Sequence, residues 1–161
     1  MPVVSTVRVE RADHFDFGGL RVHWMIGGTD TDRRFAVVHH PIAPHALAAP
    51  LHRHHNEDEY SFVLEGSLGA LLGDEVVTAE PGQWVFKPRM QWHSFWNPGD
   101  TPCRIIEVIS PAGFEHYFRE VAAHWGDMDR FQAINAKYEL DMDVDSVSQL
   151  CERFGLTFPN L

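Results

Sequence analysis

The sequence predicts an all-β protein, a small antiparallel β-barrel that is followed by a short helical tail. Residues 5–110 divide into short runs rich in β-branched and aromatic residues, and Gly, Pro, Asn or Asp separates these runs. Many short strands with regular turns are typical of sandwiches and barrels. After residue 110 the apolar spacing changes to the three- and four-residue period of amphipathic helices.

The expected strands lie within residues 1–112, which we predict to form the barrel. In order, they are TVRVE, LRVHWMI, RFAVVHHPI, EYSFVLEG, LGALLG, EVVTAE, QWVFKP, WHSFWN and CRIIEVIS. Turn residues separate them, as at Gly27-Gly28 and Pro81-Gly82.

Three helices are expected in the tail of residues 113–161. Their apolar positions are, in order, Phe114, Tyr117, Phe118 and Val121; Met128, Phe131, Ile134 and Tyr138; and Val147, Leu150, Cys151 and Phe154. Gly126 and Gly155 stand where glycine caps would end the first and third helices, and Ser146 and Gln149 fit a capping box. Because such helices are too short to stand alone, they should pack on the barrel as part of the same domain.

Composition limits the classes of partner. The 161 residues suit one domain, and a formal net charge of −10 would repel phosphate backbones and anionic membranes. We therefore expect neither a nucleic-acid nor a membrane partner. No apolar run is long enough to span a bilayer and the N-terminus does not resemble a signal peptide, which predicts a cytoplasmic location. Cys103 and Cys151 are too few and too far apart to indicate a disulfide framework or a thiolate metal site.

The stretch LHRHHNEDEYSFVLEG, residues 51–66, carries the first candidate for chemistry. If LHRHH is extended, His52 and His54 point to the same side, and two imidazoles could bind one ion. Glu59 follows a short turn and could supply a carboxylate to the same ion. An exposed, histidine-rich turn would explain His52 and His54 equally well.

A fourth candidate ligand lies in GQWVFKPRMQWHSFWN. His93 stands in a run of aromatic and apolar residues, where burying an imidazole is costly unless it is paired or ligated. Alternation puts Phe95 on the same side as His93, and we predict it as a wall of the pocket. Glu107 alternates with Ile105 and Ile109, so it either faces the barrel lumen beside the site or faces solvent.

Both stretches resemble the two motifs of the cupin superfamily. His52, His54, Glu59 and Gly66 follow H-x-H-x4-E-x6-G, and Gly82, Pro88, His93 and Asn97 follow G-x5-P-x4-H-x3-N. Ala46 and Met90 stand where these motifs usually have Gly, which concerns loop geometry and not the ligands. The helical tail is similar to that of single-domain bacterial cupins grouped with quercetin dioxygenases.

The resemblance implies a jelly-roll barrel, also called a double-stranded β-helix, with one metal ion inside. The implied ligands are His52, His54, Glu59 and His93. Four protein ligands leave two positions open on an octahedral ion such as Fe, Mn, Ni, Co or Cu, enough for substrate and dioxygen. Zn in the same cage would favour redox-neutral chemistry.

We therefore expect a metal-dependent oxidoreductase, a dioxygenase that acts on a small phenolic or enolic compound. Glu59 is expected to act also as the catalytic base, because a carboxylate in an apolar barrel has reason to be more basic. A redox-neutral lyase, isomerase or cyclase and a non-catalytic small-molecule binder remain as alternatives. A homodimer is expected, since cupin barrels usually pair and the strands TVRVE and LRVHWMI offer edges to a partner.

Overall fold

The computed structural model describes residues 12–159. The expected strand TVRVE, residues 6–10, lies outside this range. Within the described residues, none of the helices is both long and apolar enough to cross a membrane.

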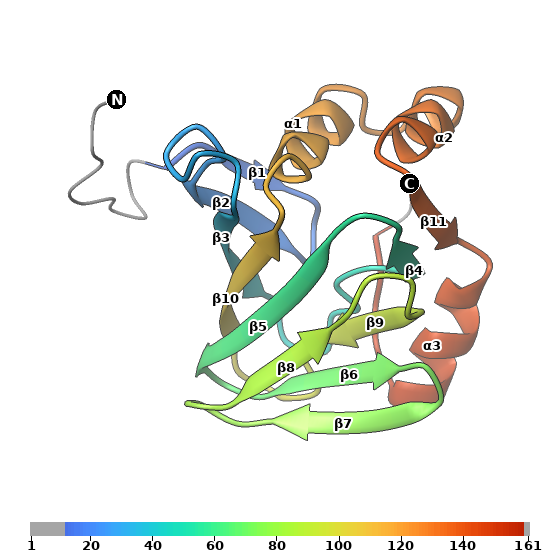
Figure 1. Cartoon of the computed structure of the whole chain (residues 1–161). Coiled ribbons are helices and arrows are strands. Elements are labelled where there is room, and N and C mark those ends of the chain that lie inside the picture. Colours follow the sequence, from blue (N-terminus) through green and yellow to red (C-terminus); the bar gives the residue numbers. More distant parts are fainter. Residues whose placement is uncertain (1–11, 160–161) are drawn as a thin grey trace.

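Two antiparallel sheets face each other and form the barrel (Figure 1). The six-stranded sheet has the order β1-β2-β3-β10-β5-β8, and the five-stranded sheet has the order β11-β4-β9-β6-β7. The strands are β1 (His14–Asp16), β2 (Arg21–Ile26), β3 (Ala36–Ile42), β4 (Leu51–His54), β5 (Asp58–Glu65), β6 (Leu68–Leu72), β7 (Glu75–Ala79), β8 (Trp84–Lys87), β9 (His93–Trp96), β10 (Cys103–Ser110) and β11 (Leu140–Asp143).

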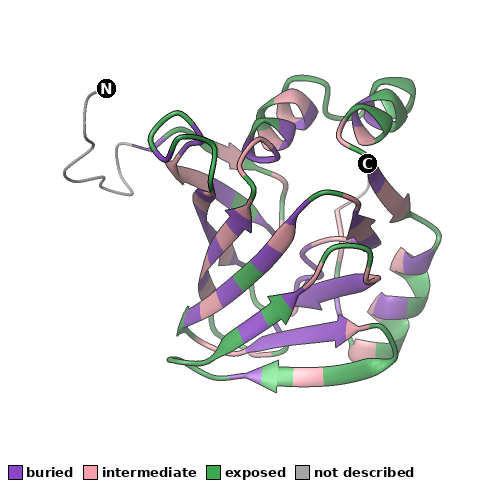
Figure 2. Cartoon of the chain, in the orientation of Figure 1, coloured by how far each residue is buried: buried purple, intermediate pink, exposed green. Residues whose placement is uncertain are grey.

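Alternation of apolar and polar residues places the core between the two sheets. In β10 every second residue is buried, and Cys103, Ile105 and Ile109 belong to the main apolar cluster. Figure 2 shows the same alternation of buried and exposed residues along β5 and β8. The strands expected between residues 20 and 110 all form, so the predicted antiparallel barrel is confirmed.

The three expected helices form as α1 (Glu115–Ala123), α2 (Met128–Lys137) and α3 (Ser146–Phe154). Figure 1 shows α1 and α2 at one end of the barrel. α3 covers the outside of the five-stranded sheet, where Phe154 stacks on Trp96 with ring centroids 4.2 Å apart. The tail thus packs on the barrel, while the boundary at residue 112 stays a prediction.

Two details of the tail differ from expectation. The capping box at α3 does not form, because the hydroxyl of Ser146 donates to the carbonyl of Asp143 and accepts from the amide of Leu51. The segment between α2 and α3 also forms an unexpected strand, β11, which pairs with β4. Its register places Leu140 opposite His54 and thereby covers the strand that carries two candidate ligands.

A left-handed backbone at Met90 explains one departure from the motif. Met90 has φ of 66°, a conformation that glycine adopts most easily and that costs other residues ~1–2 kcal/mol. Its amide nevertheless bonds to the carbonyl of His54 at 2.7 Å, which ties the loop before β9 to β4. The turn that the motif's glycine would favour is therefore present here with methionine.

Candidate metal centre

The four predicted ligands come from both sheets and meet in the barrel interior. His52 and His54 lie on β4 and alternate inward, and both are buried. His93 lies on the neighbouring strand β9, in direct register with His52. Glu59 enters from β5 in the opposite sheet. The structure thus brings together residues that lie far apart in the chain, such as His52 and His93, which are separated by 41 positions.

The ligating atoms of these four residues are close enough to share one ion. One ligand atom from each lies within 4.8 Å of the other three. Nε2 of His54 lies 3.4 Å from Oε1 of Glu59, and Nε2 of His93 lies 3.4 Å from Oε2 of the same carboxylate. Both of these buried ring nitrogens are without a hydrogen-bond partner in the described residues. Buried polar atoms are rarely left unpaired, so this arrangement fits a bound cation.

Backbone carbonyls hold two of the imidazoles in the orientation that a metal ion requires. Nδ1 of His52 lies 2.7 Å from the carbonyl of Pro50, and Nδ1 of His93 lies 3.1 Å from the carbonyl of Gln91. When Nδ1 donates its N–H to a carbonyl, Nε2 carries no proton, and its lone pair is directed inward and is free to bind an ion. Glu57, which our sequence reasoning overlooked, lies with Oε2 3.6 Å from Nδ1 of His54.

Burial favours the neutral form of two histidines of the cluster, His52 and His93. It lowers the pKa of His52 well below the usual value, and the neighbouring His93 and His54 lower it further. Burial also lowers the pKa of His93, against the opposing effect of Glu59. Neutral imidazole is the form that binds metal ions, so this environment favours ligation.

Lys87 is a further site residue that the sequence reasoning missed. It is fully buried on β8, with Nζ 3.1 Å from Oε2 of Glu59 and 3.0 Å from Oε2 of Glu107. Its ammonium also lies 4.4 Å from the ring centroid of Phe95. QWVFKP carries no local signal for this residue, because alternation with the large apolar side chains of Trp84 and Phe86 would favour an outward Lys87, whereas the structure has the reverse.

Glu107 faces the lumen, the first of the two orientations left open by its alternation. Its Oε2 accepts a hydrogen bond from the hydroxyl of Ser61 at 2.7 Å, while its Oε1 is buried and has no hydrogen-bond partner within residues 12–159. Burial raises the pKa of Glu107 to about 7, although Lys87 opposes this effect. A carboxyl with this pKa can both take and return a proton near neutral pH.

Glu59 has the opposite electrostatic environment, and the expectation of a more basic Glu59 is wrong for the metal-free site. Burial alone would raise the pKa of Glu59, but Lys87, His54 and His93 together hold it well below the usual range. Glu59 is therefore ionised, which suits a metal ligand, and the carboxyl with the raised pKa is Glu107.

The cluster opens into a cavity of about 60 Å³, which we call the inner chamber. Phe95 and Glu107, the two predicted pocket residues, both line it. Three of the four candidate ligands also line it, namely His52, His54 and Glu59. The rest of its wall is mostly apolar and includes residues of α1. A ligand in this chamber would meet the cluster on one side and aromatic side chains on the other.

Comparisons with known proteins agree with this fold. Residues 38–109 match the family model described as the cupin domain. Over 60 residues the chain is 37% identical to the tetracenomycin polyketide synthase protein TcmJ of Streptomyces glaucescens. The matched segment covers 37% of this chain and 40% of TcmJ. The chain spans less than half the length of the curated relatives it matches.

Solved structures show the same barrel at low sequence identity. KdgF from Halomonas sp. superposes with a TM-score of 0.61 and 18% identity, covering 70% of this chain and 97% of KdgF. A sugar phosphate isomerase of the cupin superfamily from Silicibacter pomeroyi gives a TM-score of 0.58 and 19% identity, covering 65% of this chain and 74% of that protein. These likenesses establish a shared fold.

Proposed function

Because the chain carries a cupin domain and belongs to the cupin superfamily, we propose that it binds one divalent metal ion and acts on a small molecule. The proposed ligands are His52, His54, Glu59 and His93. The observation that carries this proposal is the convergence of three imidazoles and one carboxylate, with Nε2 of His54 and of His93 lacking hydrogen-bond partners among the residues that the structure describes.

The substrate we propose is a small phenolic or enolic compound. When bound, a divalent metal ion would supply Lewis-acid stabilisation of the substrate oxygen and, if it is Fe, Mn, Ni, Co or Cu, a site for dioxygen as well. The aromatic wall of the inner chamber, including Phe95 and Phe114, suits a flat, apolar molecule.

Proton transfer in this proposal belongs to two carboxyl groups that differ in environment. Glu59 belongs to the cluster, and its low pKa makes it the weaker base of the two. Glu107 is the better-tuned group, because its pKa is about 7 and its free Oε1 belongs to a residue lining the inner chamber. Lys87 lies within ion-pair distance of both carboxylates, so a change of charge on one of them alters the electrostatic environment of the other.

Dioxygenation is the first reaction that we propose for this site. A phenol or enol that loses its proton becomes electron-rich enough to react with dioxygen. The inner chamber would hold the deprotonated substrate against the cluster and keep bulk water away, because most of its wall is apolar.

A redox-neutral reaction is the second candidate, and the Lys87–Glu107 pair favours it. An isomerase, lyase or cyclase needs a group that removes a proton and a group that returns it, and buried Glu107 can do both. The sugar phosphate isomerase with the same barrel illustrates such chemistry on this fold.

One experiment separates these reactions. Protein purified without a chelating tag is analysed for metal, then loaded in turn with Fe(II), Mn(II), Ni(II), Co(II), Cu(II) and Zn(II). Oxygen uptake and substrate conversion are followed with catechols, β-diketones and flavonols, in air and under nitrogen. Oxygen uptake that accompanies conversion supports the dioxygenase. Conversion under nitrogen supports the redox-neutral enzyme, and no conversion under either gas favours a binding protein.

The strand LRVHWMI offers no free edge, because β2 pairs with β1 on one side and β3 on the other, and we propose instead that a second copy of the chain covers the outer face of the six-stranded sheet. Two rows of side chains run across this face in register, Val37-Val108-Tyr60-Phe86 and His39-Ile106-Phe62-Trp84. Trp84 is 57% exposed and Phe86 is 48% exposed. No carboxylate stands in either row, although the chain carries a net charge of −10, so these rows would bring no like charges together between two copies.

A further inference from the structure

A second cavity adjoins the inner chamber and has a different chemical character. This outer chamber measures about 90 Å³ and lies between the barrel and the tail. The two cavities adjoin each other and share part of their lining. Five residues line both: Leu20, Ala49, Tyr117, Phe118 and Met142.

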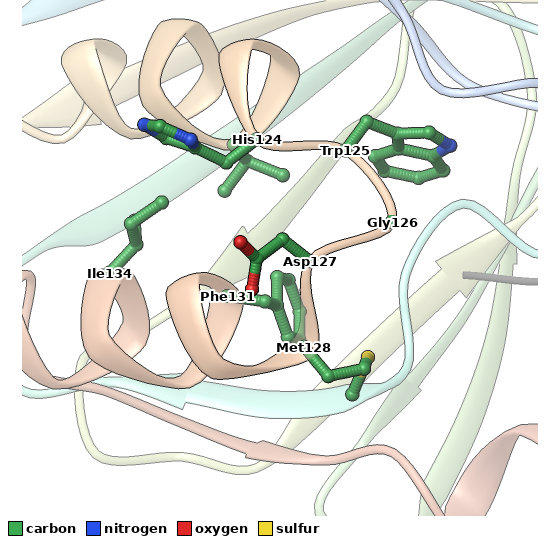
Figure 3. Close-up of a pocket in the computed structure, with 8 residues that line it drawn as sticks. His124, Trp125, Gly126, Asp127, Met128, Phe131 and Ile134 are labelled. Atoms are coloured by element: carbon green, nitrogen blue, oxygen red, sulfur yellow. The ribbon is translucent and has the colours of Figure 1, made fainter.

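The outer chamber is lined by apolar side chains, with no charged residue among those that line it. The tail supplies much of this lining, including Val121 and Trp125 from α1 and its following turn and Phe131 from α2. Figure 3 shows the connection between α1 and α2, with Trp125 turned away from His124. Trp125 is 41% exposed, so one side of the outer chamber is open toward solvent.

We infer that the outer chamber binds an apolar substituent of the same molecule whose oxygen-bearing head lies in the inner chamber. This inference rests on the proposed function for the position of the head. The ligand class is then a phenol or enol that carries a short alkyl or aryl group. The polar end would face the cluster around Glu59, and the apolar end would pass Phe118 and Met142 toward Trp125.

The size of the chambers limits this ligand. Together they approach the ~150 Å³ of a cavity that holds one benzene ring, an example from T4 lysozyme. The enclosed part of the ligand is therefore limited to about the size of one ring, and any further part of the substituent must leave through the open side near Trp125. A phosphate head is disfavoured, since Lys87 beside the inner chamber is already paired with Glu59 and Glu107.

The test compares the binding of ligands of increasing chain length, with oxygen excluded so that dioxygenation does not occur. Zn-loaded protein is titrated calorimetrically with catechol and with 4-methyl-, 4-ethyl- and 4-propylcatechol. Each methylene that enters the outer chamber should lower Kd about three- to fourfold, as expected from the transfer free energy of a buried CH₂. A parallel titration of metal-free protein with ethylbenzene and propylbenzene follows the methyl NMR signal of Met142, which lines both chambers.

Two variants locate the effect. Ala48→Leu fills the outer chamber, because Ala48 lines it and does not line the inner chamber. It should abolish the gain per methylene while catechol binds as in the wild type. Trp125→Ala alters the open side at a partly exposed position and should reduce the gain for the propyl compound. The matched control, Ala123→Leu at an exposed position of α1, should follow the wild type.

The outcomes separate this inference from the proposed function. If catechol binds but neither series tightens with chain length, the outer chamber does not bind the substituent and the inference is wrong. The same holds if Ala48→Leu preserves the full gain. If propylbenzene shifts the Met142 signal in the wild type and not in Ala48→Leu while catechol fails to bind, the apolar site is confirmed and the proposed head group is wrong.

Discussion

The ammonium nitrogen of Lys87 lies 3.1 Å from Oε2 of Glu59, inside the barrel and shielded from solvent. The same nitrogen lies 3.0 Å from Oε2 of Glu107. Burial lowers the pKa of Lys87, but Glu107 and Glu59 together raise it above the usual value. The buried ammonium of Lys87 thus connects Glu59, a candidate metal ligand, with Glu107, a candidate proton carrier.

Lys87→Met should destabilise the metal-free protein by about 3 kcal/mol or more, since removing one partner leaves a buried carboxylate uncompensated. Urea unfolding at pH 7.5 measures this change. The double variant Lys87→Met with Glu107→Gln should recover part of the loss, because it removes one of the two carboxylates. Lys137→Met, which breaks an exposed pair with Glu120, is the control and should cost less than ~1 kcal/mol. Equal losses for Lys87→Met and Lys137→Met would contradict the buried network.

Changing His52, His54 or His93 singly to Ala should lower both metal content and Tm. Metal binding to the folded state adds stability, so a lost ligand removes both effects together. Elemental analysis and thermal unfolding of each variant provide the measurement. His45→Ala is the control, because His45 is partly exposed and pairs with Asp100 outside the cluster. Full metal content in all three ligand variants would show that the site is wrongly assigned.

Glu59→Gln and Glu107→Gln should separate metal binding from proton transfer. Glu59→Gln should weaken metal binding and reduce turnover, whereas Glu107→Gln should retain the metal and still lose ~10²-fold or more in kcat. Because the pKa of Glu107 is about 7, its carboxylate becomes protonated as pH falls and can no longer accept a proton. Wild-type kcat should therefore decline below about pH 7. Glu75→Gln, at an exposed position, serves as the control for both. Normal turnover in Glu107→Gln would exclude Glu107 as the proton carrier.

His39 should make the protein less stable in mild acid. Burial and the nearby Arg104 lower the pKa of His39 to about 4, against ~6.5 in the unfolded chain. Between these two values the unfolded chain binds a proton that the folded chain does not, so the free energy of unfolding falls as pH decreases through this window. His39→Gln should make that decline shallower in metal-free protein, while His45→Gln should not. Identical slopes for wild type and His39→Gln, measured by urea unfolding from pH 7 to 4.5, would refute the assignment.

The wild-type chain should be a homodimer at micromolar concentration, as light scattering can measure. Trp84→Lys should shift it to the monomer, because a charge in the middle of a buried apolar interface is costly. Val144→Lys, at another exposed apolar position, should leave the dimer intact. A wild-type monomer, or a Trp84→Lys dimer of unchanged stability, would argue against an interface on this face.

Local patterns in the sequence were enough for most of the strands and for the three helices, but they missed β1 and β11 and left the pair His52 and His54 between an ion site and an exposed turn. Alternation in a strand and the helical period are properties of a few consecutive residues, so they can be recognised without knowing the rest of the fold. The motif spacing added Glu59 and His93, and the structure places all four within reach of one ion. The sequence did not decide whether Glu107 faces the lumen or the solvent, because alternation separates the two faces of a strand without showing which of them is inside.

Only the tertiary structure decided which face of each strand became the interior. Trp84 and Phe86 are the more apolar residues of β8, yet they face outward and Lys87 faces inward. This orientation depends on pairing with β5, whose Glu59 lies opposite Lys87 in register. Pairing of this kind, like that between β11 and β4, joins segments far apart in the chain. Sequence spacing therefore predicted the candidate ligand set, and long-range packing determined the buried lysine and the chambers beside it.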